Sequence, residues 1–198
     1  MKKYTVLFII LVLCACSQQK QDVEWDNIPL AEGDLVFRKG LGTKTRAVLH
    51  VDTLGIYSHV GIVVVQDSVF RVVHITPGER EADENVDRIK IEDLSQFWAT
   101  DRAKNGAVYR LRNNGSGKTA AQQALRLLQK GILFDHDYRL ADTTQMYCTQ
   151  LVWYAYQQAG RDITSGKRSD LNVPLYSGLY ILPSDIYTNQ DLQLIYKF

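Results

Sequence analysis

The sequence predicts an α+β domain in which an antiparallel sheet packs against helices. Runs of β-branched residues lie in the first half of the chain, two of them are joined by a short polar connection, and two amphipathic helical segments come later. The 198 residues are 45% hydrophobic and 23% charged. These values are typical of a globular domain and exclude disordered, collagen-like and coiled-coil chains.

Four segments have the pattern of strands in this sheet: 34–38, 59–65, 69–75 and 107–112. The second and third are rich in Val and Ile and are separated only by residues 66–68, which favours a hairpin. The fourth alternates apolar and polar residues with a period of two, as expected of a half-exposed strand. Residues 41–57 contain Gly42, Gly55 and several Thr, and we expect an irregular surface loop there.

Two segments have helical periodicity, at 119–130 and at about 145–159, and each is followed by a Gly of the kind that ends helices. The apolar stripe of the second helix follows the spacing of a core-facing surface: Cys148, Leu151, Val152, Ala155 and Ala159. Thr143 and Thr144 are candidate N-caps. This assignment puts Cys148 in the first turn of a helix that packs on the sheet.

The N-terminus resembles a bacterial lipoprotein signal. Lys2 and Lys3 precede an apolar run at 6–13, which is too short to span a bilayer because spanning needs about 20 residues. Residues 13–16, Leu-Cys-Ala-Cys, fit a lipobox that ends in a lipidated Cys16. We therefore expect a signal peptide at 1–15, a lipidated tether at 16–28 and the folded domain at 29–198. The alternative is an ordinary signal peptide with a nearby cleavage site.

Cysteine usage singles out Cys148. Cys14 is expected to leave with the signal and Cys16 to carry lipid, so Cys148 remains as the only free thiol of an exported protein. One interpretation is an inert, buried small side chain. The other is a nucleophile, because the uncapped N–H groups of a helix start favour an anion and are expected to lower the thiol pKa. The same amides are able to stabilise an oxyanion.

A thiol nucleophile needs a base, and the chain has four histidines: His50, His59, His74 and His136. If the 59–65 and 69–75 strands pair across residues 66–68, His59 and His74 are cross-strand neighbours. One imidazole is then able to act as the base for Cys148 while the other orients it. The alternative is that both are structural side chains.

Two segments carry a family resemblance: residues 57–63 (YSHVGIV) and 147–153 (YCTQLVW). They resemble the signature segments of the permuted papain-like amidases, the YiiX/YaeF-type branch of the NlpC superfamily, which is related to the lecithin:retinol acyltransferases. Residues 33–37, 134–138 and 182–186 resemble further family segments. The His strand precedes the Cys helix, the reverse of the order in papain, as in this branch.

The resemblance implies a circularly permuted papain-like (NlpC-type) catalytic domain with its nucleophile at a helix N-terminus. Carried over, Cys148 is the nucleophile and His59 the base. His74 occupies the third position, where relatives often have an acidic residue. A neutral His orients another imidazole but stabilises an imidazolium less than a carboxylate does.

Further residues are candidates for shaping the substrate pocket: Tyr57, Asp135, Tyr138 and Tyr176, with Tyr180 in the same predicted loop as Tyr176. Ordinary packing is the alternative for the tyrosines. The run Asp135, His136 and Asp137 is not expected to hold a metal, because adjacent residues do not easily converge on one ion. We expect no cofactor. The net charge of +1 is not that of a strongly basic domain, so we expect no binding to nucleic acid.

The functional expectation is a lipid-anchored cysteine amidase or peptidase that cleaves an amide bond through a thioester acyl-enzyme. The resemblance implies an amide of cell-wall peptides or of another acylated amino compound as substrate. Two alternatives remain open: an acyltransferase or lipid esterase with the same Cys-His site, and a non-catalytic lipoprotein that binds wall fragments. The expected location is the bacterial cell envelope, with the protein facing the periplasm or the exterior.

Overall fold

The computed structural model describes residues 27–79, 85–173 and 176–198. The predicted signal peptide, Cys16 and nearly all of the predicted tether lie outside these residues. Six strands form the main sheet, in the order β10-β5-β1-β2-β3-β4, and all neighbouring pairs are antiparallel. The strands are β1 (Leu35–Lys39), β2 (His59–Gln66), β3 (Val69–Ile75), β4 (Ile89–Asp93), β5 (Asn105–Leu111) and β10 (Leu192–Lys197). The predicted antiparallel α+β architecture is confirmed.

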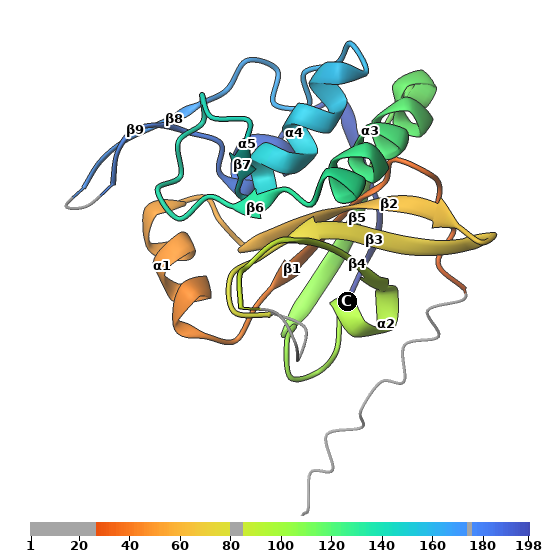
Figure 1. Cartoon of the computed structure of the whole chain (residues 1–198), viewed down its shortest axis with the longest axis horizontal. Helices are drawn as coiled ribbons and strands as arrows, with labels where there is room; N and C mark the ends of the chain where they lie inside the picture. Colours follow the sequence, from red (N-terminus) through yellow and green to blue (C-terminus); the bar gives the residue numbers. More distant parts are fainter. Residues whose placement is uncertain (1–26, 80–84, 174–175) are drawn as a thin grey trace, which may run out of the picture.

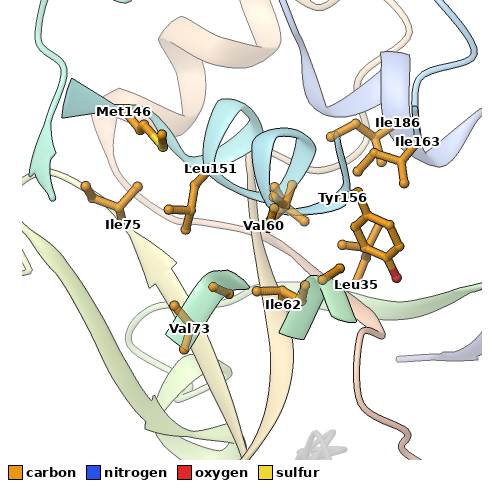
Figure 2. Packing of buried hydrophobic residues seen from close by; sticks show 14 of the residues in the cluster. Leu35, Val60, Ile62, Val73, Ile75, Met146, Leu151, Tyr156, Ile163 and Ile186 are labelled. Carbon is orange, nitrogen blue, oxygen red and sulfur yellow. The ribbon is translucent and has the colours of Figure 1, made fainter. Parts of the chain in front are cut away.

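Helices cover both faces of the sheet, as Figure 1 shows. On one face lie α3 (Gly117–Lys130) and α4 (Cys148–Gln158), and on the other lies the short α2 (Leu94–Phe97). Figure 2 shows side chains of β1, β2 and β3 packed under α4, among them Val60 against Leu151. A second buried cluster, with Phe97 and Trp98, fills the opposite face. Because β2 is buried on both faces, its sequence is a continuous apolar run rather than an alternating one.

The β2–β3 hairpin has a tighter turn than predicted. Gln66 pairs with Val69, so the loop is only Asp67 and Ser68, whose φ values of 52° and 65° are typical of a type I′ turn. The register continues through Ile62 opposite Val73, which puts Gly61, not His59, opposite His74. The register that would put His59 directly opposite His74 is therefore not the one formed, but the two residues are neighbours across the hairpin, as predicted, and lie on a diagonal.

The segment predicted as a loop at 41–57 contains helix α1 (Thr43–Val51). None of its residues is buried, so its sequence lacks the apolar stripe that reveals a core-facing helix. Its C-cap residue, Asp52, is buried, and the Asp52 carboxylate accepts a hydrogen bond of 3.0 Å from the Ser184 N–H. Ser184 belongs to α5 (Pro183–Tyr187), so this contact ties α1 to the C-terminal part of the fold.

The two predicted helices are present with changed starts. Helix α3 begins at Gly117, and Gly131 ends it with a left-handed φ of 64°. Helix α4 begins at Cys148 after the N-cap residue Tyr147, so the predicted Thr143 and Thr144 caps are wrong. Both threonines precede a short strand, β7 (Gln145–Met146), which pairs in parallel with β6 (Leu133–Phe134).

A small hairpin completes the molecule. It consists of β8 (Ser169–Val173) and β9 (Tyr176–Tyr180), which form their own two-stranded sheet. Tyr176 and Tyr180 therefore lie in a strand and not in the predicted loop. A single turn of 3-10 helix, η2 (Asn114–Ser116), precedes α3. Among the described helices, none combines the length and the apolar character that crossing a bilayer requires.

Candidate active site

Cys148 and His59 line one cavity, with a volume of about 520 Å³. Cys148 is the first residue of α4 and His59 the first residue of β2. Helix α4 packs against β2, with Val60 of the strand beneath the helix in Figure 2. Cys148 is partly exposed, and it is the free cysteine within the described residues. The fold thus brings the predicted nucleophile and base, far apart in sequence, to the same cavity.

The thiol of Cys148 rests in its protonated form. Burial raises its pKa to about 11, although the backbone N–H groups of Val60 and Thr149 act in the opposite direction, as does the charge of Arg38. The expectation that the helix start lowers this pKa is therefore wrong in net direction, because loss of solvent around the sulfur outweighs the helix N–H groups. A protonated thiol needs a base during the reaction.

His59 and His74 form a direct pair. Nε2 of His59 lies 2.9 Å from Nδ1 of His74, and both rings are buried. The rings meet edge to face, with centroids 5.0 Å apart, and both contact the Phe97 ring. The Nε2 atom of His59 is occupied by its contact with His74. The other ring nitrogen of His59, Nδ1, is therefore the one available to interact with Cys148.

Gly61 makes this diagonal contact possible. A Cβ atom at position 61 would lie 2.4 Å from Cγ1 of Val72 and 3.1 Å from Cβ of His74. Any larger residue at position 61 would thus push against the strand that carries His74.

Glu92 extends the pair to a third buried group that the sequence analysis missed. Oε1 of Glu92 lies 3.0 Å from Nε2 of His74, and Glu92 comes from β4, where Lys90 is the direct partner of His74. The contact has the distance of an ion pair, but the two atoms are not aligned as in an ideal hydrogen bond. The residues from Ile89 to Glu92 alternate apolar and charged side chains, a signal that would have predicted this strand.

Three cations surround Glu92 and the neighbouring Glu79. Lys90 Nζ and Arg102 NH1 lie 3.0 Å and 2.9 Å from Glu92 Oε2. The same two cations approach Glu79 at 3.4 Å and 3.6 Å, and buried Arg38 pairs with Glu79 as well. The Arg38 guanidinium also donates to the Phe97 carbonyl and lies over the Phe97 ring, 4.7 Å from its centre. Arg38 is thus fixed beside the histidine pair.

Both histidines are neutral in this setting. Burial lowers the pKa of His59 well below its ordinary value, and the charges of Arg38 and Lys90 and the neighbouring His74 lower it further. Burial also lowers the pKa of His74, although Glu92 acts in the opposite direction. For Glu92, burial favours a raised pKa, but the contacts with His74 and Lys90 outweigh it and hold the pKa far below the ordinary value. The carboxylate is therefore charged.

Within the described residues, one group of three side chains has the spacing of metal ligands: His74, Glu79 and Glu92, whose ligand atoms lie within 4.8 Å of one another. The group does not fit a metal ion. Both carboxylates already contact Lys90 and Arg102, and Arg38 adds a third positive charge beside Glu79. A metal cation would have to displace these ion pairs in a buried site.

The predicted substrate-binding residues have different positions. Tyr138 lines the cavity. Tyr57 does not: its buried ring packs against Phe37 and Tyr187. Asp135 also lies outside the cavity lining, and its carboxylate accepts hydrogen bonds from the N–H groups of the turn that follows. Tyr176 begins β9, and its side chain lies outside the described part of the chain.

Much of the cavity lining is apolar. These side chains come from α1, from the segment before the Cys helix, and from the β8–α5 region: Val48, Val51, Phe134, Tyr138, Leu171, Ile181 and Leu182. Charged groups also line the cavity, among them Lys44 of α1 together with Arg38, Glu79 and Arg102. The cavity therefore offers both apolar surface and charged side chains to a bound molecule.

The start of α4 is held by buried polar contacts that the sequence analysis did not identify. The Gln150 amide group accepts from the Tyr147 N–H and donates to the carbonyls of Leu140 and Asp142. The Tyr147 hydroxyl accepts from the Ile181 N–H, and the Thr149 hydroxyl donates to the Ile181 carbonyl. These contacts fix Cys148 from both sides.

Comparison with known proteins identifies a matching family and a solved structure with a similar fold. A model of the family described as permuted papain-like amidase enzymes, YaeF/YiiX (C92 family), matches residues 29–196. Among solved structures, the chain is similar to YiiX from Escherichia coli O157:H7, described as a metalloprotein, with a TM-score of 0.66 and 22% identity over 84% of this chain and 97% of that one. The search of curated proteins found no match. The likeness to YiiX shows the same fold.

Proposed function

This chain belongs to the permuted papain-like amidase family, whose members are cysteine hydrolase-type enzymes, and from this we propose that it is a lipid-anchored cysteine amidase with Cys148 as nucleophile and His59 as base. The observation that carries the proposal is the shared cavity of Cys148 and His59, with His59 held by His74 at 2.9 Å. Nucleophile, base and orienting group are the three parts that such catalysis requires.

The resting charges favour proton transfer that accompanies bond formation. The Cys148 sulfur attacks the amide carbonyl carbon while its proton passes to the neutral His59 ring, and the carbonyl becomes an oxyanion. The C–N bond then breaks, and His59 returns the proton to the leaving amine. This leaves a thioester on Cys148. A water molecule, deprotonated by His59, hydrolyses the thioester and restores the thiol.

We propose amides of cell-wall peptides or of another acylated amino compound as the substrate class. The apolar side chains that line the same cavity as Cys148, such as Val48, Phe134 and Leu171, favour the acylated compound, because an acyl group is able to bury its apolar surface there. The charged side chains at the same cavity, such as Arg38 and Arg102, are compatible with polar ends of a peptide.

The same apolar lining favours a second candidate, in which the enzyme acts on lipid esters or passes an acyl group from Cys148 to an amine or alcohol. The chemistry at Cys148 is unchanged up to the thioester. Only the bond that is cleaved, or the final acceptor, differs.

The envelope location rests on the sequence of the first 16 residues, with its basic start, apolar run and lipobox. Lipid on Cys16 would place the catalytic domain at a membrane surface through a short tether. Labelling cells with a tagged fatty acid tests this directly. The label is expected on the wild type and absent from Cys16→Ala.

The test of the activity compares wild type with Cys148→Ser and His59→Ala on wall-derived peptides and on acyl esters, in parallel. We expect hydrolysis of an amide by the wild type, with a loss on the order of 10²-fold or more in His59→Ala. A thioester that is trapped on Cys148 and detected by mass spectrometry is expected as well. Preferred ester cleavage or acyl transfer indicates the second candidate. Tight binding of wall fragments without turnover in all three proteins would instead indicate a binding lipoprotein.

A further inference from the structure

Glu92 ends a line of buried polar atoms that begins at the cavity. The line runs from His59 Nε2 to His74 Nδ1 over 2.9 Å and from His74 Nε2 to Glu92 Oε1 over 3.0 Å. The three residues come from β2, β3 and β4, which are neighbours in the sheet. His74 thus lies between His59 and Glu92, with one ring nitrogen toward each of them.

The carboxylate of Glu92 fixes the direction of every proton in this line. An ionised carboxylate only accepts hydrogen bonds, so the His74 nitrogen that faces it, Nε2, must carry the proton. A neutral His74 then has a lone pair on Nδ1, and the His59 Nε2 that faces this lone pair must be the donor. A neutral His59 with its proton on Nε2 has its lone pair on Nδ1. This is the nitrogen that remains for Cys148.

We propose that Glu92 is a positioning residue of the active site, which acts through His74 to hold His59 in the tautomer that accepts the thiol proton. The proposal rests on the proposed function. The acidic group thus comes from β4, the strand next to the one that carries His74. Glu92 also supplies the negative charge that a neutral His74 lacks when His59 becomes positive.

The cations beside Glu92 make a sharp test possible. Lys90 and Arg102 both contact Oε2 of Glu92 at 2.9–3.0 Å. In Glu92→Gln, these two donors are expected to hold the amide oxygen in the Oε2 position, which leaves the amide NH₂ facing His74. His74 Nε2 must then accept, so the His74 proton moves to Nδ1 and the His59 proton also moves to Nδ1. The variant has nearly the same side-chain volume, but it reverses the donor and acceptor roles of both histidines.

The experiment is a measurement of histidine tautomers by NMR on protein with ¹⁵N-labelled histidine, with assignment by His59→Ala and His74→Ala. In the wild type we expect the proton on Nε2 of both histidines, and in Glu92→Gln on Nδ1 of both. Asp93→Asn is the matched control: it removes the adjacent carboxylate of the same strand, whose side chain is 52% exposed and pairs with Arg71. This control is expected to leave both tautomers as in the wild type.

Activity gives the second readout. Glu92→Gln is expected to lower turnover on the order of 10²-fold or more, since a base in the wrong tautomer does not accept the thiol proton, while Asp93→Asn retains turnover. A wild-type His59 with its proton on Nδ1, or unchanged tautomers in Glu92→Gln, would overturn the proposal. The tautomers are measured without substrate. A failure of the proposed amidase activity therefore does not alter this result.

Discussion

The protonated thiol of Cys148 follows from its surroundings. The sulfur lies at a helix start, which favours a thiolate, but burial outweighs this and raises its pKa to about 11. His59 shares the cavity, and because burial lowers its pKa the ring is neutral and able to accept a proton, although it is a weak base that does not deprotonate the resting thiol. If Cys148 is the proposed nucleophile, these surroundings favour activation during the reaction over storage as a thiolate.

This gives a prediction for the reactivity of Cys148. Alkylation of the free enzyme by iodoacetamide is expected to be slow near pH 7 and to rise through pH 9 and above, because only the thiolate reacts and the pKa is raised. The rate is measured at Cys148 by peptide mass mapping. The unfolded protein serves as the control, with a thiol pKa near ~8.5. A rate that reaches its plateau below the pH seen for the unfolded chain would contradict the raised pKa.

Gly61 allows a second residue-level prediction. Gly61→Ala is expected to destabilise the protein by about 1–3 kcal/mol, because the new methyl group overlaps Cγ1 of Val72 and crowds Cβ of His74. Thermal unfolding measures the stability, and turnover is expected to fall with it as His74 shifts. Gly115→Ala is the comparison variant, since a Cβ at position 115 meets nothing within 4 Å. Equal melting temperatures for both variants would count against the close packing at Gly61.

At the scale of elements, helix α1 depends on one buried carboxylate. Asp52 follows the helix and accepts a hydrogen bond from the Ser184 N–H of α5, and burial raises its pKa. A raised pKa in the folded state means that stability is lost as the pH rises through that pKa, because the charged form is disfavoured by burial. The Asp52 carboxylate therefore stabilises the contact between α1 and α5 as a hydrogen-bond acceptor, while its negative charge destabilises the folded state.

Two substitutions of Asp52 distinguish its role as a hydrogen-bond acceptor from the effect of its negative charge. Asp52→Asn retains an oxygen for Ser184 and is expected to match or exceed the wild-type melting temperature at pH 7, with a smaller difference near pH 4. Asp52→Ala leaves the buried Ser184 N–H without this acceptor and is expected to lose about 1–3 kcal/mol. Calorimetry at both pH values measures the two effects. An Asn variant as unstable as the Ala variant would mean that the charge itself stabilises α1.

The elements differ in how well the sequence predicts them. Strand β2 and helix α4 carry strong local signals, so the segments with His59 and Cys148 are predictable. Helix α1 has no buried residue and therefore no apolar stripe, and it was expected as a loop. The hairpin register differed because Asp67 and Ser68 both adopt positive φ, which no Gly or Asn signals at either position. Glu92 reaches His74 only through the pairing of β3 with β4, a tertiary contact that sequence reasoning did not identify.

At the scale of the whole molecule, the last strand, β10, forms one edge of the main sheet. Strand β10 pairs with β5 at one edge, and Phe198 packs on Trp98 with ring centres 5.2 Å apart. The Phe198 N–H also donates to the Gly106 carbonyl. The C-terminus therefore covers the face of the sheet that carries Phe97, the ring beneath both histidines.

Removal of residues 192–198 is expected to abolish cooperative unfolding, because it takes away an edge strand and opens the cluster around Trp98. Near-ultraviolet circular dichroism and thermal melting report this loss. Phe198→Ala is the milder comparison: it keeps the strand, so it is expected to lower the melting temperature while the transition stays cooperative. A cooperative transition in the truncated chain would show that the β5 edge does not need its partner.

The tight β2–β3 turn has a consequence for the order in which the site is assembled. His59 and His74 are only 15 residues apart, and hairpins close within about 1–10 μs, whereas chains are synthesised at about 5–20 residues per second. The histidine pair can thus form early, while α4 and its thiol are added much later in the chain. A chain that ends before residue 148 contains the proposed base and lacks the proposed nucleophile. The proposed site is therefore complete only after α4 has been synthesised and has docked on β2.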